Sequence, residues 1–220
     1  MRKKRLLSTI VVGLMIILAA VSAHAEDFGV VMGFGAVIHN FVESDDLRRK
    51  PGKFPGEVDI KLVFGNEVYG EYFIWDNFAF GIKGQHMEGG VNYDREYDTL
   101  KLRIKLKNYI GYGNFLAKVG SGYWRLGITG GYGRSRYTYT EERECKTNAI
   151  SCSNIYEEDS STGSIVLLGF IVDWGRKALG GRLGVHSVAA NHPAIEVADG
   201  EKLEVKASGS QLFVDFRYAF

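Results

Sequence analysis

The stretch that decides the fold is the last nine residues, Leu212-Phe213-Val214-Asp215-Phe216-Arg217-Tyr218-Ala219-Phe220. Every even position in it is apolar, and the charged residues Asp215 and Arg217 stand between them. Successive side chains of a β-strand point to opposite faces, so the pattern predicts a strand with one apolar face and one charged face. The apolar face continues to the last position, which is the aromatic residue Phe220.

The other end of the chain has the features of a secretory signal peptide. Four cations at residues 2–5 precede an almost purely apolar stretch, residues 6–21. Ala23 and Ala25 then supply small side chains at the two positions that a signal peptidase recognises, so we predict cleavage after Ala25 and a mature domain of residues 26–220. The alternative is an uncleaved membrane helix, because the uncharged stretch is nearly long enough to span a bilayer.

The composition excludes several classes of protein. Without the four cations of the signal, 23 of the 27 Lys and Arg remain against 26 Asp and Glu, and this slightly acidic balance does not indicate a nucleic-acid partner. After residue 25 no apolar run is long enough for a transmembrane helix. Alternating strands closed into a barrel are the other way to satisfy every backbone hydrogen bond in lipid.

Eight segments of the mature chain alternate in the way that membrane strands do. Long polar loops are expected on one side of the strands and short turns on the other: loops at 42–55, 140–162 and 193–200, and turns at 75–77, 120–122 and 175–178. An even strand number with this asymmetry is what a bacterial barrel requires. The sequence therefore predicts one all-β domain, an eight-stranded antiparallel up-and-down transmembrane β-barrel, with strands near 28–41, 58–74, 78–83, 100–107, 124–133, 164–174, 179–190 and 212–220.

The clearest alternation lies in residues 100–107. One face carries Leu100, Leu102, Ile104 and Leu106, and the other carries Lys101, Arg103, Lys105 and Lys107. A sheet in water would place the lysines in solvent and the leucines in a core, whereas a barrel in lipid would do the reverse. We predict the second arrangement, with a bulge near residues 108–113 where the alternation breaks.

The aromatic residues gather at the end of the strands where the short turns are expected. Indole and phenyl rings prefer the headgroup layer of a bilayer, so these residues predict a girdle on the periplasmic side. Its members are Trp75, Trp124, Trp174, Phe28 and Phe220.

Several stretches resemble the small outer-membrane barrels of the OmpW- and OmpX-like kind. Residues 70–80 are similar to their short periplasmic turn, residues 123–133 to their Gly-spaced fifth strand, and the terminal Phe220 to their assembly signature. The resemblance implies a bacterial outer-membrane location, lipid and lipopolysaccharide as surroundings, and the barrel-assembly machinery as a partner of the C-terminal strand. It implies a non-enzymatic narrow or lateral path for small solutes, or alternatively a sealed barrel that acts through its extracellular loops.

Many charged residues are predicted to face the interior. An eight-stranded barrel is only wide enough for side chains to fill it or for one small ligand, and unpaired charges there are costly. We therefore expect an ion-pair network, with Asp173 pairing with Arg182, and with Gly29, Gly33 and Gly35 leaving room for Asp215 and Arg217 of the last strand. The other interpretation is a cation-lined path for anionic or small polar solutes. The predicted interior charges are Asp59, Lys61, Lys83, Lys101, Arg103, Lys105, Arg125, Asp173, Arg182, Asp215 and Arg217.

Two expectations concern the loops. Cys145 and Cys152 are the only cysteines, and in an exported loop they most simply form a disulfide; with no His near them, a metal or redox role is not expected. A basic cluster in the first loop is predicted to contact lipopolysaccharide phosphates, although Asp45 and Asp46 offset its charge and an ordinary solvated loop is the alternative. That cluster is Arg48, Arg49, Lys50 and Lys53.

An enzyme that modifies lipid A is the third possibility. The lipid A deacylases use a His and a Ser two residues apart on one face of a strand, whereas His186 and Ser187 are adjacent here. Adjacent residues point to opposite faces and cannot share a proton, so no catalytic residue is predicted. His39 and His186 are expected to face inward, where Asp173 or Asp215 could orient one of them. No cofactor or metal site is predicted.

Overall fold

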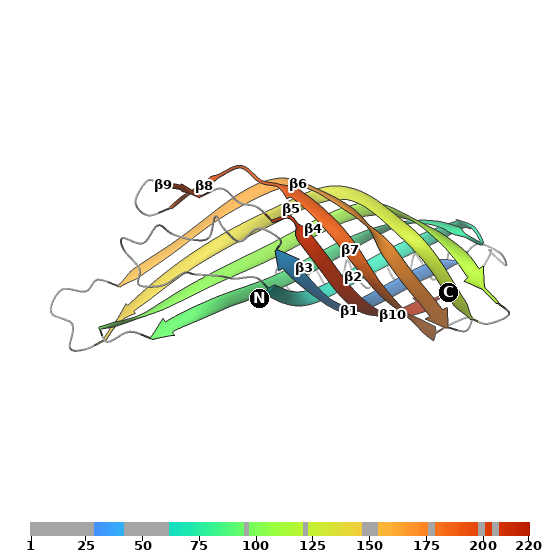
Figure 1. The fold of residues 1–220 in the computed structure, drawn as a ribbon, viewed down its shortest axis with the longest axis horizontal. Helices are drawn as coiled ribbons and strands as arrows, with labels where there is room; N and C mark the ends of the chain where they lie inside the picture. The colour runs from blue at the N-terminus through green and yellow to red at the C-terminus, as the bar shows by residue number, and fades with distance from the viewer. Residues whose placement is uncertain are drawn as a thin grey trace, which may run out of the picture.

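The described part of the chain closes into the predicted barrel. The computed structural model describes residues 29–41, 62–94, 97–120, 123–146, 154–175, 179–197, 201–203 and 207–220. Eight antiparallel strands form a ring in the order β1-β10-β7-β6-β5-β4-β3-β2, as Figure 1 shows. Their bounds are β1 Val30–Phe41, β2 Leu62–Trp75, β3 Phe78–Asp94, β4 Asp98–Val119, β5 Trp124–Cys145, β6 Ile155–Gly175, β7 Leu179–Asn191 and β10 Gly209–Ala219.

A small hairpin was not predicted. The strands β8, Ile195–Val197, and β9, Glu201–Leu203, pair with each other where a loop was expected. Both lie outside the ring and belong to the connection between β7 and β10. None of the residues that the structure describes form a helix long and apolar enough to cross a membrane.

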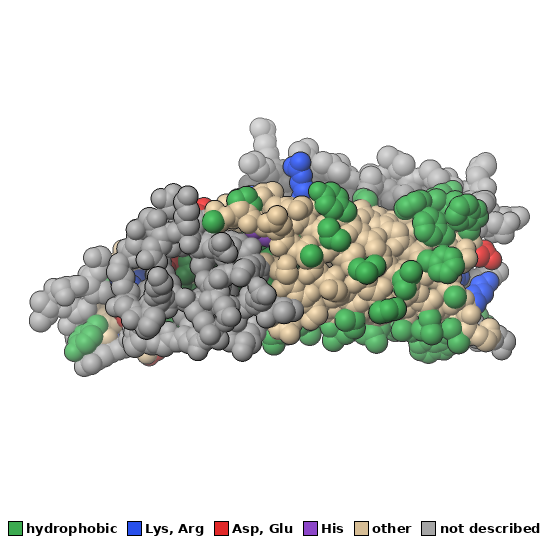
Figure 2. Space-filling model, turned by 45° about the horizontal axis from the view of Figure 1, so that its top comes forward, with side chains coloured by type: hydrophobic (Ala, Val, Ile, Leu, Met, Phe, Trp, Pro, Cys, Tyr) green, Lys and Arg blue, Asp and Glu red, His purple; other side chains and the backbone are tan. Residues whose placement is uncertain are grey.

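The wall of the barrel is apolar outside, and its interior holds charged and polar side chains beside buried apolar ones. In β10, Leu212, Val214 and Phe216 are 45%, 45% and 66% exposed, while Phe213 and Asp215 between them are buried. Figure 2 shows apolar side chains over the wall of the barrel and charged side chains at its end. Exposed rows of large apolar side chains around a charged interior suit lipid rather than water, so the alternation that predicted the barrel is confirmed.

The orientation predicted for residues 100–107 is wrong. Leu100 and Ile104 point inward and are almost fully buried, while Arg103 points outward and is exposed. The register of β4 runs without a shift over residues 99–115 against β3 and over residues 98–119 against β5. The bulge expected near 108–113 is therefore absent from these described residues as well. Because even positions face inward throughout β4, the lysines of this segment lie on the outside.

The orientation of residues 100–107 is reversed because four strands extend beyond the membrane. The strands β4, β5 and β6 have 22, 22 and 21 residues, whereas β1 and β10 have 12 and 11. Figure 1 shows the upper parts of β3 to β6 continuing to the left of the ring; we call these parts, residues 88–94, 98–107, 136–145 and 155–163, the extension. Water surrounds the extension, so its lysines face out and its leucines face in. The loop predicted at 140–162 is therefore largely strand.

The tryptophans mark the opposite end. The rings of Trp124 and Trp174, which face each other across β5 and β6, lie 5.7 Å apart, and Trp75 lies 5.8 Å from Phe78. All three are at the short-turn end, as predicted. Phe220 is exposed at the same end, whereas Phe28 lies outside the described residues. This row places the short turns at a membrane interface, and the periplasmic side stays a prediction.

Candidate functional site

The centre of the lumen is crossed by one buried arginine. Arg182, on β7, forms a bidentate pair with Glu71, on β2: Nη1 contacts Oε1, and Nη2 donates to Oε2 at 2.8 Å. Nη2 also donates to Asp173 on β6 at 2.8 Å. Because β1 and β10 lie between β2 and β7 in the ring, the contact between Arg182 and Glu71 joins opposite walls of the barrel.

Further polar groups complete this layer. Arg217 Nε lies 2.8 Å from Asp173 Oδ1, so Asp173 sits between two arginines. Tyr112 donates from its hydroxyl to Glu71 at 2.7 Å, and Asn114 donates from its amide at 2.6 Å. Glu71 thus accepts from three side chains, which offsets the cost of burying its charge.

A second layer lies above the first. Gln85 donates to Glu67 at 2.7 Å and to Gln211, on β10, at 3.1 Å, and Asn108 donates to Gln85 at 3.0 Å. Lys83 Nζ lies 3.6 Å from Glu67 and is placed over the rings of Tyr112 and Phe213. The contacts of Gln85 with Gln211 and of Lys83 with Phe213 reach across the ring, because β3 and β10 are not neighbours. Together we call the two layers the lumen network.

Asp215 is buried beside the lumen network without an ion pair among the described residues. It faces Arg182 across the β10–β7 register, yet the guanidinium of Arg182 is turned toward Glu71 and Asp173. The space that Asp215 needs comes from Gly35 on β1, where an added Cβ would lie 2.1 Å from Oδ1. This agrees with the predicted role of Gly35, whereas the space over Gly33 is filled by Tyr69 instead.

The predicted interior charges divide into four groups. Lys83, Asp173, Arg182, Asp215 and Arg217 lie inside, and Asp173 pairs with Arg182 as expected. Arg125 lies at the lower rim, where its Nη1 donates to the carbonyl of Asp76 at 3.3 Å. The predicted interior position is wrong for Lys101, Arg103 and Lys105, which face outward on the extension, and Asp59 and Lys61 lie outside the described residues.

Two central members of the network were missed by the sequence analysis. Glu67 and Glu71 are both buried and both occupy odd positions of β2. Val68 and Tyr72, at even positions of the same strand, are large and apolar or aromatic, which indicates that the odd positions face inward. The parity of the strand was therefore the signal that could have found them.

The histidines do not form a catalytic arrangement. His186 is buried and stacked 4.5 Å from the ring of Phe213, and Ser187 faces outward on the other side of β7. His39 is buried beside Phe41, with ring centroids 4.6 Å apart. Neither ring contacts a carboxylate within hydrogen-bond distance in the described part of the chain. The same residues contain no group of three or more His, Cys, Asp or Glu that could hold a metal ion.

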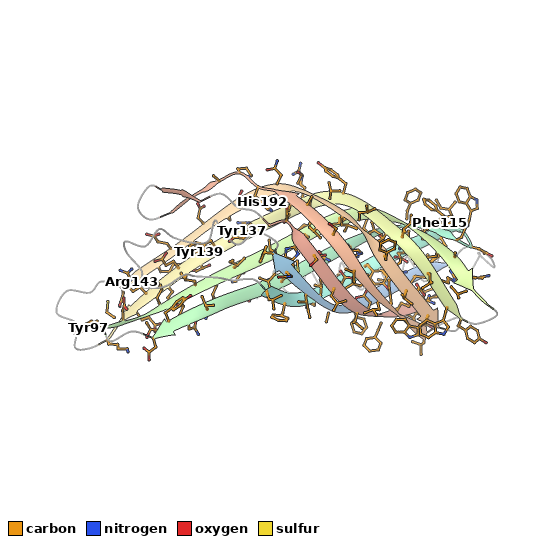
Figure 3. All side chains as sticks on the ribbon, in the orientation of Figure 1. Tyr97, Phe115, Tyr137, Tyr139, Arg143 and His192 are labelled. Carbon is orange, nitrogen blue, oxygen red and sulfur yellow. The ribbon has the colours of Figure 1, made fainter. Side chains whose placement is uncertain are left out.

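Paired charges cover the tip of the extension. Lys101 Nζ lies 2.8 Å from Glu144, and its hydrogen bond lowers the pKa of that carboxyl below the ordinary range. Lys146 Nζ lies 2.7 Å from Asp94, whose pKa is lowered for the same reason. Figure 3 shows Tyr137, Tyr139 and Arg143 one after another along this part of β5.

Most of the remaining predicted loop residues lie outside the described part of the chain. Cys145 ends β5, but Cys152 lies outside the described residues, so the disulfide stays a prediction. The same is true of the first-loop cluster, Arg48, Arg49, Lys50 and Lys53, and of the signal peptide.

Comparisons with known proteins agree on the fold. No protein-family model matches the sequence, and no curated protein matches it. Among solved structures, Ail, the attachment invasion locus protein of Yersinia pestis in complex with the heparin analogue sucrose octasulfate, is similar over 88% of this chain and 99% of its own, with 10% identity and a TM-score of 0.54. OprG of Pseudomonas aeruginosa is similar over 90% and 97%, with 15% identity and a TM-score of 0.48.

Fold and polarity together define the class of protein. The ring of eight up-and-down strands, with an apolar outer wall, a charged interior and aromatic residues at the turn end, is that of a small transmembrane β-barrel. The chain therefore has the fold of a small eight-stranded β-barrel of the bacterial outer membrane, a fold that Ail shares.

Proposed function

We propose that the protein is a sealed, non-enzymatic barrel that presents its extension to a partner at the cell surface. The observation that carries the proposal is the contact between Arg182 and Glu71, which spans the lumen and is buried on both sides. Opening a path there would separate two paired charges in a site of low polarity, which is costly. The lipid-facing wall and the C-terminal strand are proposed to meet lipopolysaccharide and the barrel-assembly machinery.

The extension supplies a suitable binding surface. Beyond Glu88, β3 pairs only with β4 among the described residues, and β6 pairs only with β5 over residues 155–163. The edge of β3 therefore presents backbone donors and acceptors that a partner strand can use, whereas β8 lies against part of β6, where Ser161 donates to the Pro193 carbonyl at 2.7 Å. The sheet is held rigid by the apolar residues of its inner face, including Leu102 and Ile104.

A narrow path for small solutes is the second candidate. One observation favours it: Asp215 is buried in the lumen without an ion pair among the described residues, so a mobile ion could be attracted there. Such a path, through the lumen or sideways through the wall, would require the lumen network to rearrange. Modification of lipid A is not favoured, since His186 and Ser187 face opposite sides of β7.

Two measurements test the proposal. The first is single-channel conductance of the purified protein in a planar bilayer, where we expect no discrete openings. The second compares adhesion of expressing cells to host-cell layers before and after the extension is shortened. The shortened variant replaces residues 91–102 and residues 141–157 by short turns. Each turn then joins two residues that already pair across their strands, Gly90 with Arg103 and Thr140 with Glu158, so the barrel below keeps its pairing.

The outcomes separate the candidates. Silence in the bilayer together with loss of adhesion on shortening supports the sealed surface barrel. Discrete openings of the unaltered protein would overturn the sealed lumen and favour a solute path. Adhesion that is unchanged by shortening would overturn the role of the extension.

A further inference from the structure

A group of three cations lies on the outside of the barrel where the apolar wall ends. Lys107 on β4 and Arg136 on β5 are direct register partners, and Arg134 is the next outward residue on β5. All three side chains are exposed. Side chains directly opposite each other across two strands lie about 5 Å apart at Cβ, and like charges in that arrangement repel each other. We call Lys107, Arg134 and Arg136 the basic triad.

The triad is at the height of the outer headgroup layer. Going up β5 from the girdle residue Trp124, the outward side chains up to Tyr132 are apolar, aromatic or Gly, and the next is Arg134. Ten residues of strand rise about 33 Å along the chain, or about 25 Å at a tilt of roughly 40°, which is the height of the apolar band in such barrels. Tyr109 and Tyr132, both about two-thirds exposed, lie just below the triad, as interfacial aromatic residues do.

The charges of the triad are not compensated within the described part of the protein. Higher on the same face, Lys101 is paired with Glu142 and Glu144, and Lys105 lies 3.9 Å from Glu88. At the level of the triad, no carboxylate of the residues that the structure describes lies within 4 Å of any of the three cations. Acidic side chains therefore pair with the outward lysines of the extension but not with the three cations at the membrane border.

From these observations we infer that the basic triad binds phosphate groups on lipid headgroups of the outer leaflet. Arginines donate paired hydrogen bonds to phosphate oxygens, and a phosphate between Lys107 and Arg136 would relieve their repulsion. Arg136 is held for this purpose by its hydrogen bond from Nη2 to the Ser160 hydroxyl, at 3.1 Å. The triad stands at the lower border of the extension, where the lipid-facing wall begins. The inference rests on the proposed contact of that wall with lipopolysaccharide and deepens it by naming the side chains that bind the phosphates.

A lipid fits the position of the triad better than a soluble polyanion does. Tyr109 faces Arg134 across the two strands, so an occupant of the triad would meet an apolar, lipid-facing surface directly below it. A phosphorylated lipid places its headgroup at the cations and its acyl chains along that surface. A soluble sulfated or phosphorylated glycan would have to enter the headgroup layer to reach the same side chains.

The test measures binding of diphosphorylated lipid A by native mass spectrometry of the full chain in detergent micelles. We compare the unaltered protein with a triad variant that carries Lys107→Gln, Arg134→Gln and Arg136→Gln. We expect the triad variant to lose about tenfold or more in affinity, because each arginine and lysine contributes charge-assisted hydrogen bonds to the phosphates.

A matched control removes the same number of outward charges from the extension. It carries Lys101→Gln, Arg103→Gln and Lys105→Gln, all on the outer face of β4 above the headgroup layer. We expect its affinity for lipid A to change by less than about twofold, since charges exposed to water at a distance from the ligand are screened by salt.

Three further arms identify the ligand. Dephosphorylated lipid A should have the same affinity for the unaltered protein as for the triad variant. Inorganic phosphate and a heparin fragment are each added as competitors, and neither should displace lipid A at equal concentration. Equal losses in the triad and control variants, or equal binding of dephosphorylated lipid A, would overturn the inference. Displacement by the heparin fragment would overturn it as well and assign the triad to a soluble glycan. Each result is independent of conductance and adhesion, so it stands apart from the test of the proposed function.

Discussion

Arg182 is the residue on which the interior depends. It contacts Glu71 and Asp173 from two other strands and lies over the ring of Tyr69, with 5.0 Å between the guanidinium carbon and the ring centre. A cation in this position pairs with two buried carboxylates at once, and Arg217 beside Asp173 supplies a second positive charge. A protein interior tolerates such charges only while each keeps its partner, so the two carboxylates and the arginine are energetically coupled.

We expect Arg182→Met to lower the free energy of unfolding by about 3–5 kcal/mol, because Glu71 is left as a buried charge with no cation paired to it. Equilibrium urea unfolding in detergent micelles measures this change. Adding Glu71→Gln to the variant should recover part of the loss, and Arg103→Met on the exposed face should stay within about 0.5 kcal/mol. A loss of less than about 1 kcal/mol for Arg182→Met would show that the network contributes little to stability.

A second prediction concerns His192, which lies above the apolar wall. Its ring is buried, with Nε2 3.1 Å from the Ser135 hydroxyl, and burial lowers the pKa of His192 below its ordinary value of 6.5. Below pH 6.5 the unfolded chain therefore binds a proton that the folded protein does not, so His192 makes the protein less stable as the pH falls. The stability of the unaltered protein relative to His192→Gln should decrease between about pH 7.5 and pH 5, in urea titrations at several pH values. A constant difference between the two proteins across this range would contradict the burial of a neutral ring.

The sequence predicts some residues of the lumen network but not their contacts. Lys83, Arg182 and Asp215 follow from the alternation of their strands, because the parity of each strand fixes which side chains face inward. Alternation does not tell which inward residues meet across the lumen, since that depends on the closed order of the strands and on side-chain reach. The bidentate contact between Glu71 and Arg182 joins residues 111 positions apart and could be found only from the structure.

At the scale of the strand, the existence of the eight elements was predictable and the length of four of them was not. The polar residues of 140–162 indicate contact with water, and a loop and a strand in water share that composition. The orientation of residues 100–107 fails for the same reason. Alternation alone cannot say which face meets lipid and which meets a core, and the answer reverses where the strand leaves the membrane.

We expect single cysteines to reveal this reversal directly. In a background with Cys145→Ser and Cys152→Ser, Arg103→Cys should react with a membrane-impermeant maleimide on intact cells, because residue 103 is exposed. Ile104→Cys should be protected until the protein is denatured, because Ile104 is fully buried. Labelling at 104 with protection at 103 would restore the orientation first predicted from the sequence.

At the scale of the whole molecule, the three tryptophans mark one end of the barrel. Trp75, Trp124 and Trp174 are the only tryptophans of the chain, and all lie at the end with the short turns. In vesicles with uniformly oriented protein, iodide should quench the tryptophan fluorescence from the side of the short turns and have little effect from the other. Fluorescence spectroscopy with iodide added outside or trapped inside the vesicles measures the difference. Equal quenching from both sides would contradict the one-sided girdle.

The uneven strand lengths also bear on how the barrel is made. The strands β3 to β6 form long hairpins between neighbours in sequence, whereas β1 and β10, from the two ends of the barrel domain, are joined by eleven register pairs, from Val31 with Ala219 to Phe41 with Gly209. Closing a chain over so long a separation costs more entropy than closing a hairpin, and local contacts form faster. The order of events follows from this difference. We expect a curved sheet to grow hairpin by hairpin and β10 then to complete the ring by pairing with β1, so the final nine residues decide when the barrel is finished as well as what it is.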